Sequence, residues 1–298
     1  MTINEIRKLI RENKKTIAFI IGNGVNRYPN NPNALSWDDL LLNLWNRVSS
    51  LRLVSRPSGI SLTEFYDILE LENNQNIKLR KEVSNLMNLW EPNLHHRRMI
   101  RRIKELNIPI LTTNYDESLA KSARLRLFKI SDQGFTDFYP WSVYHGDNKW
   151  DLPTDGFGIW YINGLIKYPR SIRLGLSHYM GSVSRSRRLI HRGNEANLFT
   201  GKNISYWRGC KTWLHLIFNK SLFIFGLELE ENETFLRWLL LERIKYFRKF
   251  PRRSFKGWYL YKANNNITNK GKIFFLKRVG FEMIKVDSYK DIYEDIWN

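Results

Sequence analysis

The chain has 298 residues, with 48 lysines and arginines against 29 aspartates and glutamates, which gives a formal net charge of +19. Apolar residues make up 43% of the sequence, so the chain can bury a large core, and disorder is excluded as a description of the whole. The single cysteine, Cys210, excludes both a disulfide framework within the chain and a four-cysteine zinc module.

The first third of the chain changes from a helical pattern to a strand pattern and back. Apolar residues at helical spacing predict a short amphipathic helix over residues 2–14. The continuous apolar run TIAFII at 16–21, which ends at GNG, predicts a buried strand that leads into a glycine turn. From 35 to 106 the apolar spacing is helical again with breaks, which predicts a block of about four helices.

The rest of the chain alternates between short apolar strands and helices. NIPILTT at 107–113 predicts the second buried strand, and ENETFLRWLLLERIKYF at 231–247 predicts an amphipathic helix, whereas the aromatic, turn-rich region 128–158 shows no resolvable pattern. Further strands are predicted at 157–162, 221–226, 257–263 and 281–286. This order predicts an α/β fold with a Rossmann-like, mostly parallel sheet, helices on both faces and sites at the carboxyl ends of the strands.

The sequence contains no internal repeat, no Pro/Ser-rich linker and no low-complexity segment. We therefore expect a single domain over 1–298 with a helical insertion at 28–106. No run of about 18 uninterrupted apolar residues occurs, so we expect no membrane span and a cytoplasmic protein. The positive charge suits nucleic acid, an anionic nucleotide or an acidic partner, and composition does not choose among them.

The first candidate site is the turn GNGVNR, from Gly22 to Arg27, which follows the first predicted strand. Because Gly22 and Gly24 have no Cβ, backbone N–H groups in this turn can approach a pyrophosphate closely. Arg27 stands where GxGxxG has its third glycine, so the ordinary dinucleotide fingerprint is not met. The alternative interpretation is a tight turn that needs glycine for a positive φ.

Polar residues also follow the other predicted strands. TTNYD contributes Thr113, Asn114 and Asp116 at the end of the second strand, where a helix N-cap is the simpler interpretation. Trp37 begins a helix in SWDDLL, and its alternative role is packing in the core. The remaining strand ends contribute Asn163 in WYING, and Gly226 and Glu228 in FIFGLELEEN.

The order of these motifs resembles the sirtuin-like domain, specifically its divergent bacterial branch found in anti-phage defence. The resemblance runs from about residue 16 to the C-terminus, and TTNYD is its most specific motif. It implies a Rossmann-type domain with an inserted smaller helical part, which binds NAD between them. By position, the resemblance implies that Gly22, Asn23, Gly24 and Asn26 contact the phosphates and that Trp37 lies near the nucleotide. It implies that Thr113, Asn114 and Asp116 flank the nicotinamide ribose, and that Gly226 and Glu228 lie near the adenosine half.

The resemblance implies cleavage of the bond between nicotinamide and ribose. Nicotinamide leaves NAD as a neutral base, so the reaction needs little proton donation and depends on ordering the ribose hydroxyl or the attacking water. Asn114 offers a donor and an acceptor for that role. The family's general base is a histidine in an HG motif, but that position is Asn163 in this chain, and asparagine is not a base. His145 in YHGD is the candidate replacement, and His178 is another.

Deacetylation is the other activity of this fold, and the family's deacetylases typically carry a four-cysteine zinc module. With only Cys210, we expect a metal-free small part and NAD hydrolysis rather than deacylation.

The resemblance also implies an effector of abortive infection that is held inactive until needed. We therefore expect control by a separate sensor subunit, for which an inosine triphosphate pyrophosphatase-like protein is one candidate, or by homo-oligomerisation. The alternative is a catalytically inactive module that binds a nucleotide or nucleic acid, which the missing histidine and the charge of +19 both favour.

Overall fold

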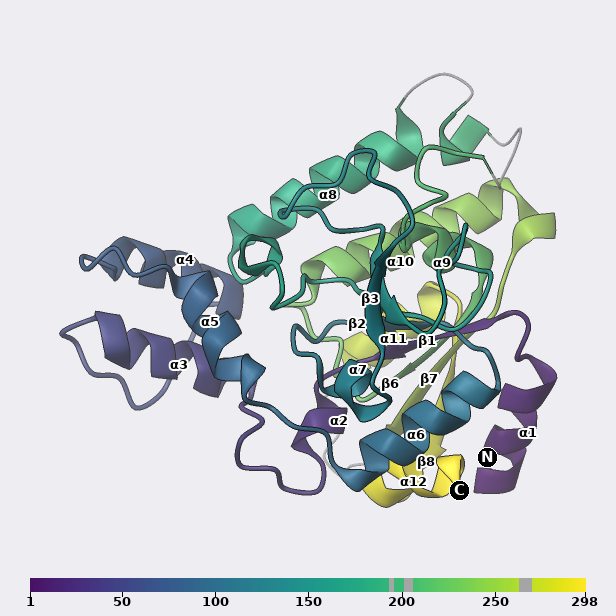
Figure 1. Ribbon diagram of the computed structural model, residues 1–298, viewed down its shortest axis with the longest axis horizontal. Helices are drawn as coiled ribbons and strands as arrows, with labels where there is room; N and C mark the ends of the chain where they lie inside the picture. Colours follow the sequence, from purple (N-terminus) through teal and green to yellow (C-terminus); the bar gives the residue numbers. More distant parts are fainter. Residues whose placement is uncertain (193–195, 201–205, 263–269) are drawn as a thin grey trace.

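A computed structural model describes residues 1–192, 196–200, 206–262 and 270–298 of the chain. Its centre is an eight-stranded sheet with the strand order β3-β4-β5-β2-β1-β6-β7-β8 (Figure 1). In chain order the strands are β1 (Ile17–Ile21), β2 (Ile110–Thr112), β3 (Arg126–Lys129), β4 (Val143–Gly146), β5 (Ile159–Tyr161), β6 (Ser221–Phe225), β7 (Gly257–Lys262) and β8 (Phe281–Val286).

The six predicted strands are confirmed as β1, β2, β5, β6, β7 and β8, and they run parallel to one another. The strand predicted at 257–263 is confirmed over 257–262, and residue 263 lies outside the described residues. Phe19 in the middle of β1 pairs with Ile110 of β2 on one side and with Phe223 of β6 on the other. The region without a resolvable pattern, 128–158, supplies β4, and β3 runs into its start. These two strands add an antiparallel edge beyond β5. The sheet is therefore mostly parallel, as a Rossmann-like fold requires.

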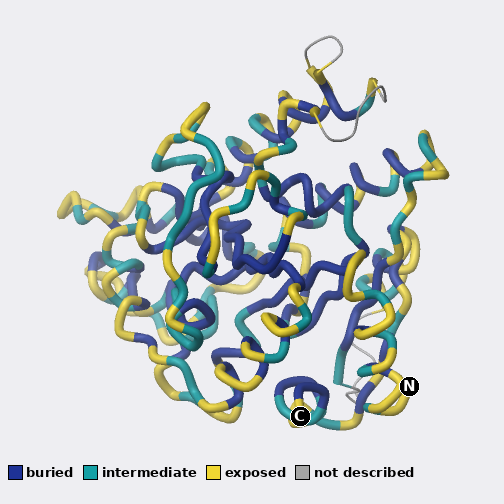
Figure 2. The backbone as a smooth tube through the Cα atoms, turned by 45° about the vertical axis from the view of Figure 1, so that its right-hand side comes forward, coloured by how far each residue is buried: buried dark blue, intermediate teal, exposed yellow. Residues whose placement is uncertain are grey.

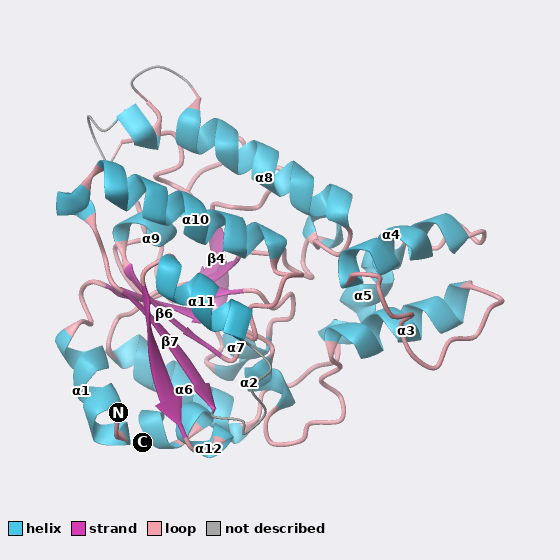
Figure 3. Cartoon of the chain, turned by 180° about the vertical axis from the view of Figure 1, so that it is seen from behind, coloured by secondary structure: helices cyan, strands magenta, loops and turns pink. Residues whose placement is uncertain are grey.

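Helices cover both faces of the sheet, and alternate side chains of β1 enter two different cores. Ile17, Phe19 and Ile21 pack with α1 (Ile3–Glu12), α6 (Leu94–Glu105), α7 (Ser118–Ser122) and α12 (Tyr289–Tyr293). Ala18 and Ile20 pack with α8 (Leu176–His191), α9 (Leu214–Asn219), α10 (Thr234–Lys249) and α11 (Lys270–Arg278). Figure 3 shows these two layers on opposite sides of the strands. In Figure 2 buried segments gather towards the centre of the molecule, and exposed segments lie mostly at its outside.

Within residues 28–106, three helices lie apart from the sheet and one lies against it. α3 (Trp37–Val48), α4 (Leu62–Glu72) and α5 (Leu79–Asn88) project from the body of the molecule (Figures 1 and 3). Trp45 of α3 stacks on Phe65 of α4, with ring centroids 5.1 Å apart. We call α3, α4 and α5 the helical subdomain. α6, by contrast, belongs to the layer that covers the sheet.

The chain order places a topological switch beside β1. From β1 the chain moves to β2 and then to β5 on one side, and it later returns to β6 on the other side of β1 before continuing to β7 and β8. In an open parallel sheet, such a reversal leaves a crevice at the carboxyl ends of the strands, where ligands bind.

None of the helices in the described part of the chain combines the length and apolar character that a membrane span requires.

Candidate functional site

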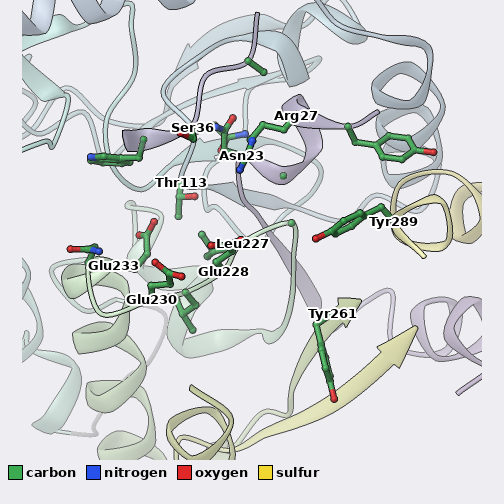
Figure 4. A pocket seen from close by; sticks show the side chains of 18 of the residues that line it. Asn23, Arg27, Ser36, Thr113, Leu227, Glu228, Glu230, Glu233, Tyr261 and Tyr289 are labelled. Carbon is green, nitrogen blue, oxygen red and sulfur yellow. The ribbon is translucent and has the colours of Figure 1, made fainter. Parts of the chain in front are cut away.

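A cavity of about 1400 Å³ lies at this switch point. Its lining includes Asn23 after β1, Thr113 after β2 and Gly226 after β6, together with Leu62 and Thr63 at the start of α4. Figure 4 shows side chains from these separate segments around one space. Sites for single small molecules usually occupy roughly 300–1,000 Å³, so this cavity has room for an extended ligand.

Gly22 and Gly24 allow the turn after β1 to pack directly on the turn after β6. A Cβ on Gly22 would lie 2.5 Å from the Gly226 carbonyl oxygen, and a Cβ on Gly24 would lie 2.9 Å from the same oxygen and would also meet the Tyr293 hydroxyl of α12. The Gly24 N–H donates to the Gly226 carbonyl at 2.8 Å. Neither Gly22 nor Gly24 has a positive φ. The turn thus requires glycine for close packing, which corrects the interpretation based on a positive φ.

A buried chain of hydrogen bonds fixes α2 (Gly24–Arg27) beneath the cavity. The Asn26 amide donates to Asp116 Oδ2 at 2.8 Å and accepts at its Oδ1 from His96 Nε2, 3.0 Å away. His96 Nδ1 accepts from the Asn93 N–H, so Nε2 carries the hydrogen. Asp116 Oδ1 accepts from the Ser118 N–H at 2.8 Å. Both carboxylate oxygens of Asp116 are therefore engaged, and burial raises the pKa of this group.

Several buried polar atoms around the cavity lack a hydrogen bond of normal geometry. They are Oδ1 of Asn114, both amide atoms of Asn163, Nε1 of Trp37 and Oε2 of Glu233. Asn114 is only 6% exposed and Asn163 is fully buried. A buried polar atom left unsatisfied costs about 1–3 kcal/mol, so a native structure rarely keeps several of them together. A polar ligand or water in the cavity could satisfy those that face it, whereas the Asn163 amide lies beside the Glu233 carboxyl group.

Aromatic side chains line the cavity near Asn114. Trp37, at the start of α3, lies against Tyr115, with ring centroids 5.6 Å apart. Tyr179 of α8 lines the same cavity, and both tyrosines are almost fully buried. Burial raises the pKa of each of these hydroxyls well above its ordinary value. They therefore stay protonated near neutral pH and support the wall as uncharged rings. Trp37, which is only half-buried, is the ring of this group that a planar base can reach.

An acidic segment follows β6. Glu228, Glu230 and Glu233 all line the cavity, and Figure 4 shows all three side chains there. Burial raises the pKa of Glu233 to about 7, the charge of Glu230 acts in the same direction, and the Asn163 amide opposes the shift. Burial and the neighbouring Glu228 charge also raise the pKa of Glu230. This segment thus places a carboxyl group that changes its charge near neutral pH inside the cavity.

Basic side chains line another part of the same cavity. They are Arg27 of α2, Lys262 of β7, Lys270 and Lys272 of α11, and Lys285 of β8. Positive charges and aromatic faces within one cavity suit a ligand that carries both phosphates and planar bases.

The structure brings most of the predicted site residues together. The cavity is lined by Asn23, Gly24, Trp37, Thr113, Asn114, Asp116, Gly226 and Glu228. Gly22, Asn26, Asn163 and His145 are not among the lining residues. Of these four, Gly22 and Asn26 belong to the turn and the hydrogen-bond chain just described, and Asn163 follows β5 beside Glu233.

His145 lies on β4, and other side chains occupy both of its ring nitrogens. The Tyr161 hydroxyl is 3.0 Å from Nδ1, and Glu117 Oε1 is 3.1 Å from Nε2. His178 accepts at Nδ1 from the Leu174 and Gly175 N–H groups at the start of α8, and burial lowers its pKa to about 4. The structure therefore gives each of these histidines protein partners outside the cavity, and the catalytic role of His145 stays a prediction.

Sequence reasoning missed Glu233, Tyr115 and Tyr179. A usable signal existed for Glu233, because the run ELEENE directly follows a predicted strand that ends in glycine. Tyr115 stands inside the TTNYD motif, which was a usable signal for it as well. Tyr179 reaches the cavity from α8, a helix far along the chain.

No protein-family model matches the sequence, and a search of curated proteins finds no match. The site must therefore be interpreted from its own geometry.

Proposed function

We propose that the cavity binds NAD and that the protein hydrolyses its nicotinamide–ribose bond, which releases nicotinamide and ADP-ribose. The observation that carries this proposal is the Asn114 side chain, whose Oδ1 is buried and unpaired at the carboxyl end of β2 while its Nδ2 donates to the Gly22 carbonyl at 3.4 Å. This bond fixes the amide, so that Oδ1 is available to a ribose hydroxyl or to a water.

The rest of the cavity supports a dinucleotide as the ligand. Trp37, a half-buried lining residue that packs against Tyr115, provides an aromatic face that suits the nicotinamide ring. The cationic side chains of Arg27 and Lys272 suit the pyrophosphate. Glu228, exposed in the segment that follows β6, can accept hydrogen bonds from a ribose. A volume of about 1400 Å³ accommodates both halves of the molecule.

The leaving nicotinamide needs little proton donation from the protein. The C1′–N1 bond of NAD breaks with its electron pair going to the pyridinium nitrogen, so nicotinamide leaves neutral. A water oxygen bonds to C1′, and its proton must pass to a base. An amide that holds the ribose or the water in line lowers the barrier by positioning, a contribution that can reach about 7–11 kcal/mol in the best-aligned intramolecular reactions.

The test is nicotinamide release from NAD, measured by chromatography. We expect Asn114→Ala to reduce the rate at least 100-fold, and the near-isosteric Asn114→Asp to reduce it by a similar factor because the carboxylate cannot donate. Asn43→Ala, on an exposed position of α3, is the matched control and should retain the wild-type rate. Equal release by wild type and Asn114→Ala would overturn the proposal.

The same resemblance that suggests NAD cleavage also motivates a role in anti-phage defence. We propose that a separate regulatory subunit or a second copy of the chain controls the activity, because a constitutive NADase depletes its host. The net charge of +19 supports an acidic partner. Nicotinamide release should therefore be measured for the chain alone and together with the products of neighbouring genes. Rapid, maximal turnover by the isolated monomer would contradict this control.

One observation favours a module that binds without catalysis: all six histidines lie in the described part of the chain, and none lines the cavity. Such a module would bind NAD or nucleic acid and release no nicotinamide under any pairing. Steep loss of affinity for DNA or RNA between low and high salt would indicate the nucleic-acid version.

A further inference from the structure

Hydrolysis of NAD as proposed above leaves one chemical requirement unmet. The attacking water must lose a proton, and the family's histidine is replaced by Asn163. His145 and His178 have protein partners outside the cavity, as do His95 and His96 beneath it. A base for this reaction must therefore come from a different residue type.

The acids that line the cavity differ in how far they are already engaged. Asp116 uses both carboxylate oxygens, Asp38 pairs with Arg56 at 2.8 Å, and Asp39 caps the start of α3 by accepting from Ser36. Glu228 and Glu230 are exposed to solvent. Glu233 is the remaining case, since its Oε2 is buried without a hydrogen bond of normal geometry.

Glu233 lines the cavity and lies beside Asn163. It directly precedes α10, at the end of the segment that follows β6, and it lines the same cavity as Asn114. The Asn163 amide, which occupies the histidine position of the family motif, lies beside its carboxyl group. Figure 4 shows the Glu233 side chain in the cavity together with Thr113, the neighbour of Asn114 in sequence.

We propose that Glu233 is the general base of the NAD hydrolysis. As the water oxygen bonds to C1′ and the C1′–N1 bond breaks with its electron pair on nicotinamide, the ionised carboxylate of Glu233 accepts the water proton and later releases it to solvent. Asn114 orients the ribose or the water, and the Asn163 amide lies beside the carboxyl group of Glu233. This inference rests on the proposed function and names the residue that makes it catalytic.

The charges around Glu233 suit this role. Glu230 is the charged neighbour of Glu233. Tyr115, in the segment after β2, and Tyr179, on α8, also face Glu233, and their hydroxyls are uncharged. With its pKa raised to about 7 by burial, Glu233 is partly ionised at neutral pH and is a stronger base than an ordinary glutamate. Because only the ionised form accepts a proton, the rate should rise with pH through about 7 and level off above it.

The experiment compares wild type with Glu233→Gln and with Glu231→Gln, using NAD as the probe. Glu231 is an exposed glutamate of the same segment and does not line the cavity, so it is a matched control. We expect Glu233→Gln to lower kcat by about 100-fold to 10,000-fold, the usual contribution of a general base, and to lose the rise with pH. The affinity for NAD, measured by calorimetry, should change less than threefold. Glu231→Gln should keep both the rate and the pH profile.

A second variant separates loss of the base from loss of the fold. Glu233→Ala leaves a gap that a small carboxylate such as formate can enter, so added formate should restore part of the rate in Glu233→Ala and none in Glu233→Gln. A Glu233→Gln variant with wild-type kcat and pH profile would overturn this inference and leave NAD hydrolysis standing. A wild-type protein that neither binds nor cleaves NAD would overturn the proposed function, and this inference with it.

Discussion

Asn26 connects two loops and a helix through a single side chain. Its amide donates to Asp116 in the segment after β2, and its oxygen accepts from His96 on α6. The residue is only 2% exposed, so water cannot replace either bond. Burial lowers the pKa of His96 to about 3, which keeps the ring neutral and preserves the hydrogen-bond direction at neutral pH. In the structure this side chain holds the turn after β1 in place, and the assignment of Asn26 to the phosphates stays a prediction.

We therefore expect Asn26→Ala to destabilise the protein by about 2–4 kcal/mol, because it leaves Asp116 Oδ2 and His96 Nε2 buried without partners. Urea denaturation monitored by tryptophan fluorescence measures this loss. Asn85→Ala, at an exposed position of α5, is the matched control and should stay within about 0.5 kcal/mol of wild type. A wild-type unfolding midpoint for Asn26→Ala would show that the hydrogen-bond chain contributes nothing to stability.

At the scale of elements, the contact between the turns after β1 and β6 defines the cavity floor. β1 and β6 are neighbours in the sheet over their whole length, from Ile17 opposite Ser221 to Ile21 opposite Phe225. Beyond that point the two turns continue side by side because neither Gly22 nor Gly24 has a side chain. A larger residue at either position must push the two strand ends apart.

Gly22→Ala tests this contact. The new Cβ would lie 2.5 Å from the Gly226 oxygen and 2.7 Å from Leu227 Cα, both backbone atoms, so the clash cannot be relieved by a rotamer change. We expect a loss of about 1–3 kcal/mol in the free energy of unfolding and a weaker affinity for NAD, measured by denaturation and calorimetry. Gly271→Ala, on α11, meets no atom within 4 Å and serves as the control. Both variants with wild-type properties would contradict the assigned role of Gly22.

At the scale of the whole molecule, buried neutral histidines make stability depend on pH. Burial lowers the pKa of His96 to about 3 and that of His215 to about 4. Each ring binds a proton near pH 6.5 in the unfolded chain but only at much lower pH in the folded one. Stability is therefore complete above pH 6.5 and is lost as the pH falls below it, by about 1.4 kcal/mol per pH unit for each ring. Glu233, with its raised pKa, acts in the opposite direction between about pH 7 and 4.5.

His215→Gln isolates one of these contributions. His215 Nδ1 accepts from the indole N–H of Trp207 at 3.0 Å, and a glutamine oxygen can take over that bond. We expect the stability difference between pH 7 and pH 5 to be about 2 kcal/mol smaller in His215→Gln than in wild type. Urea denaturation at the two pH values gives this difference. An identical difference in both proteins would show that His215 does not titrate as its burial requires.

The sequence alone determined the parts of this protein that depend on local pattern. Continuous apolar runs identified β1, β2, β5, β6, β7 and β8, because a strand buried on both faces needs apolar residues at every position. It also identified α1 and α10 by helical periodicity, and it placed Asn114 and Gly226 at strand ends, where a parallel sheet collects its ligand-binding residues. β3 and β4 escaped detection because an antiparallel edge containing Arg126 and His145 lacks a continuous apolar run.

Only the tertiary structure decided which polar residues face the cavity and which hold it together. Asn26 and Asn114 are the same residue type beside similar turns, yet one has every polar partner it needs and the other has an unpaired oxygen. Glu233 gains its raised pKa from burial and from Glu230, and it meets Asn163 across about 70 residues of chain. Burial, charge and hydrogen-bond satisfaction are set by residues distant in sequence, so no local pattern encodes them.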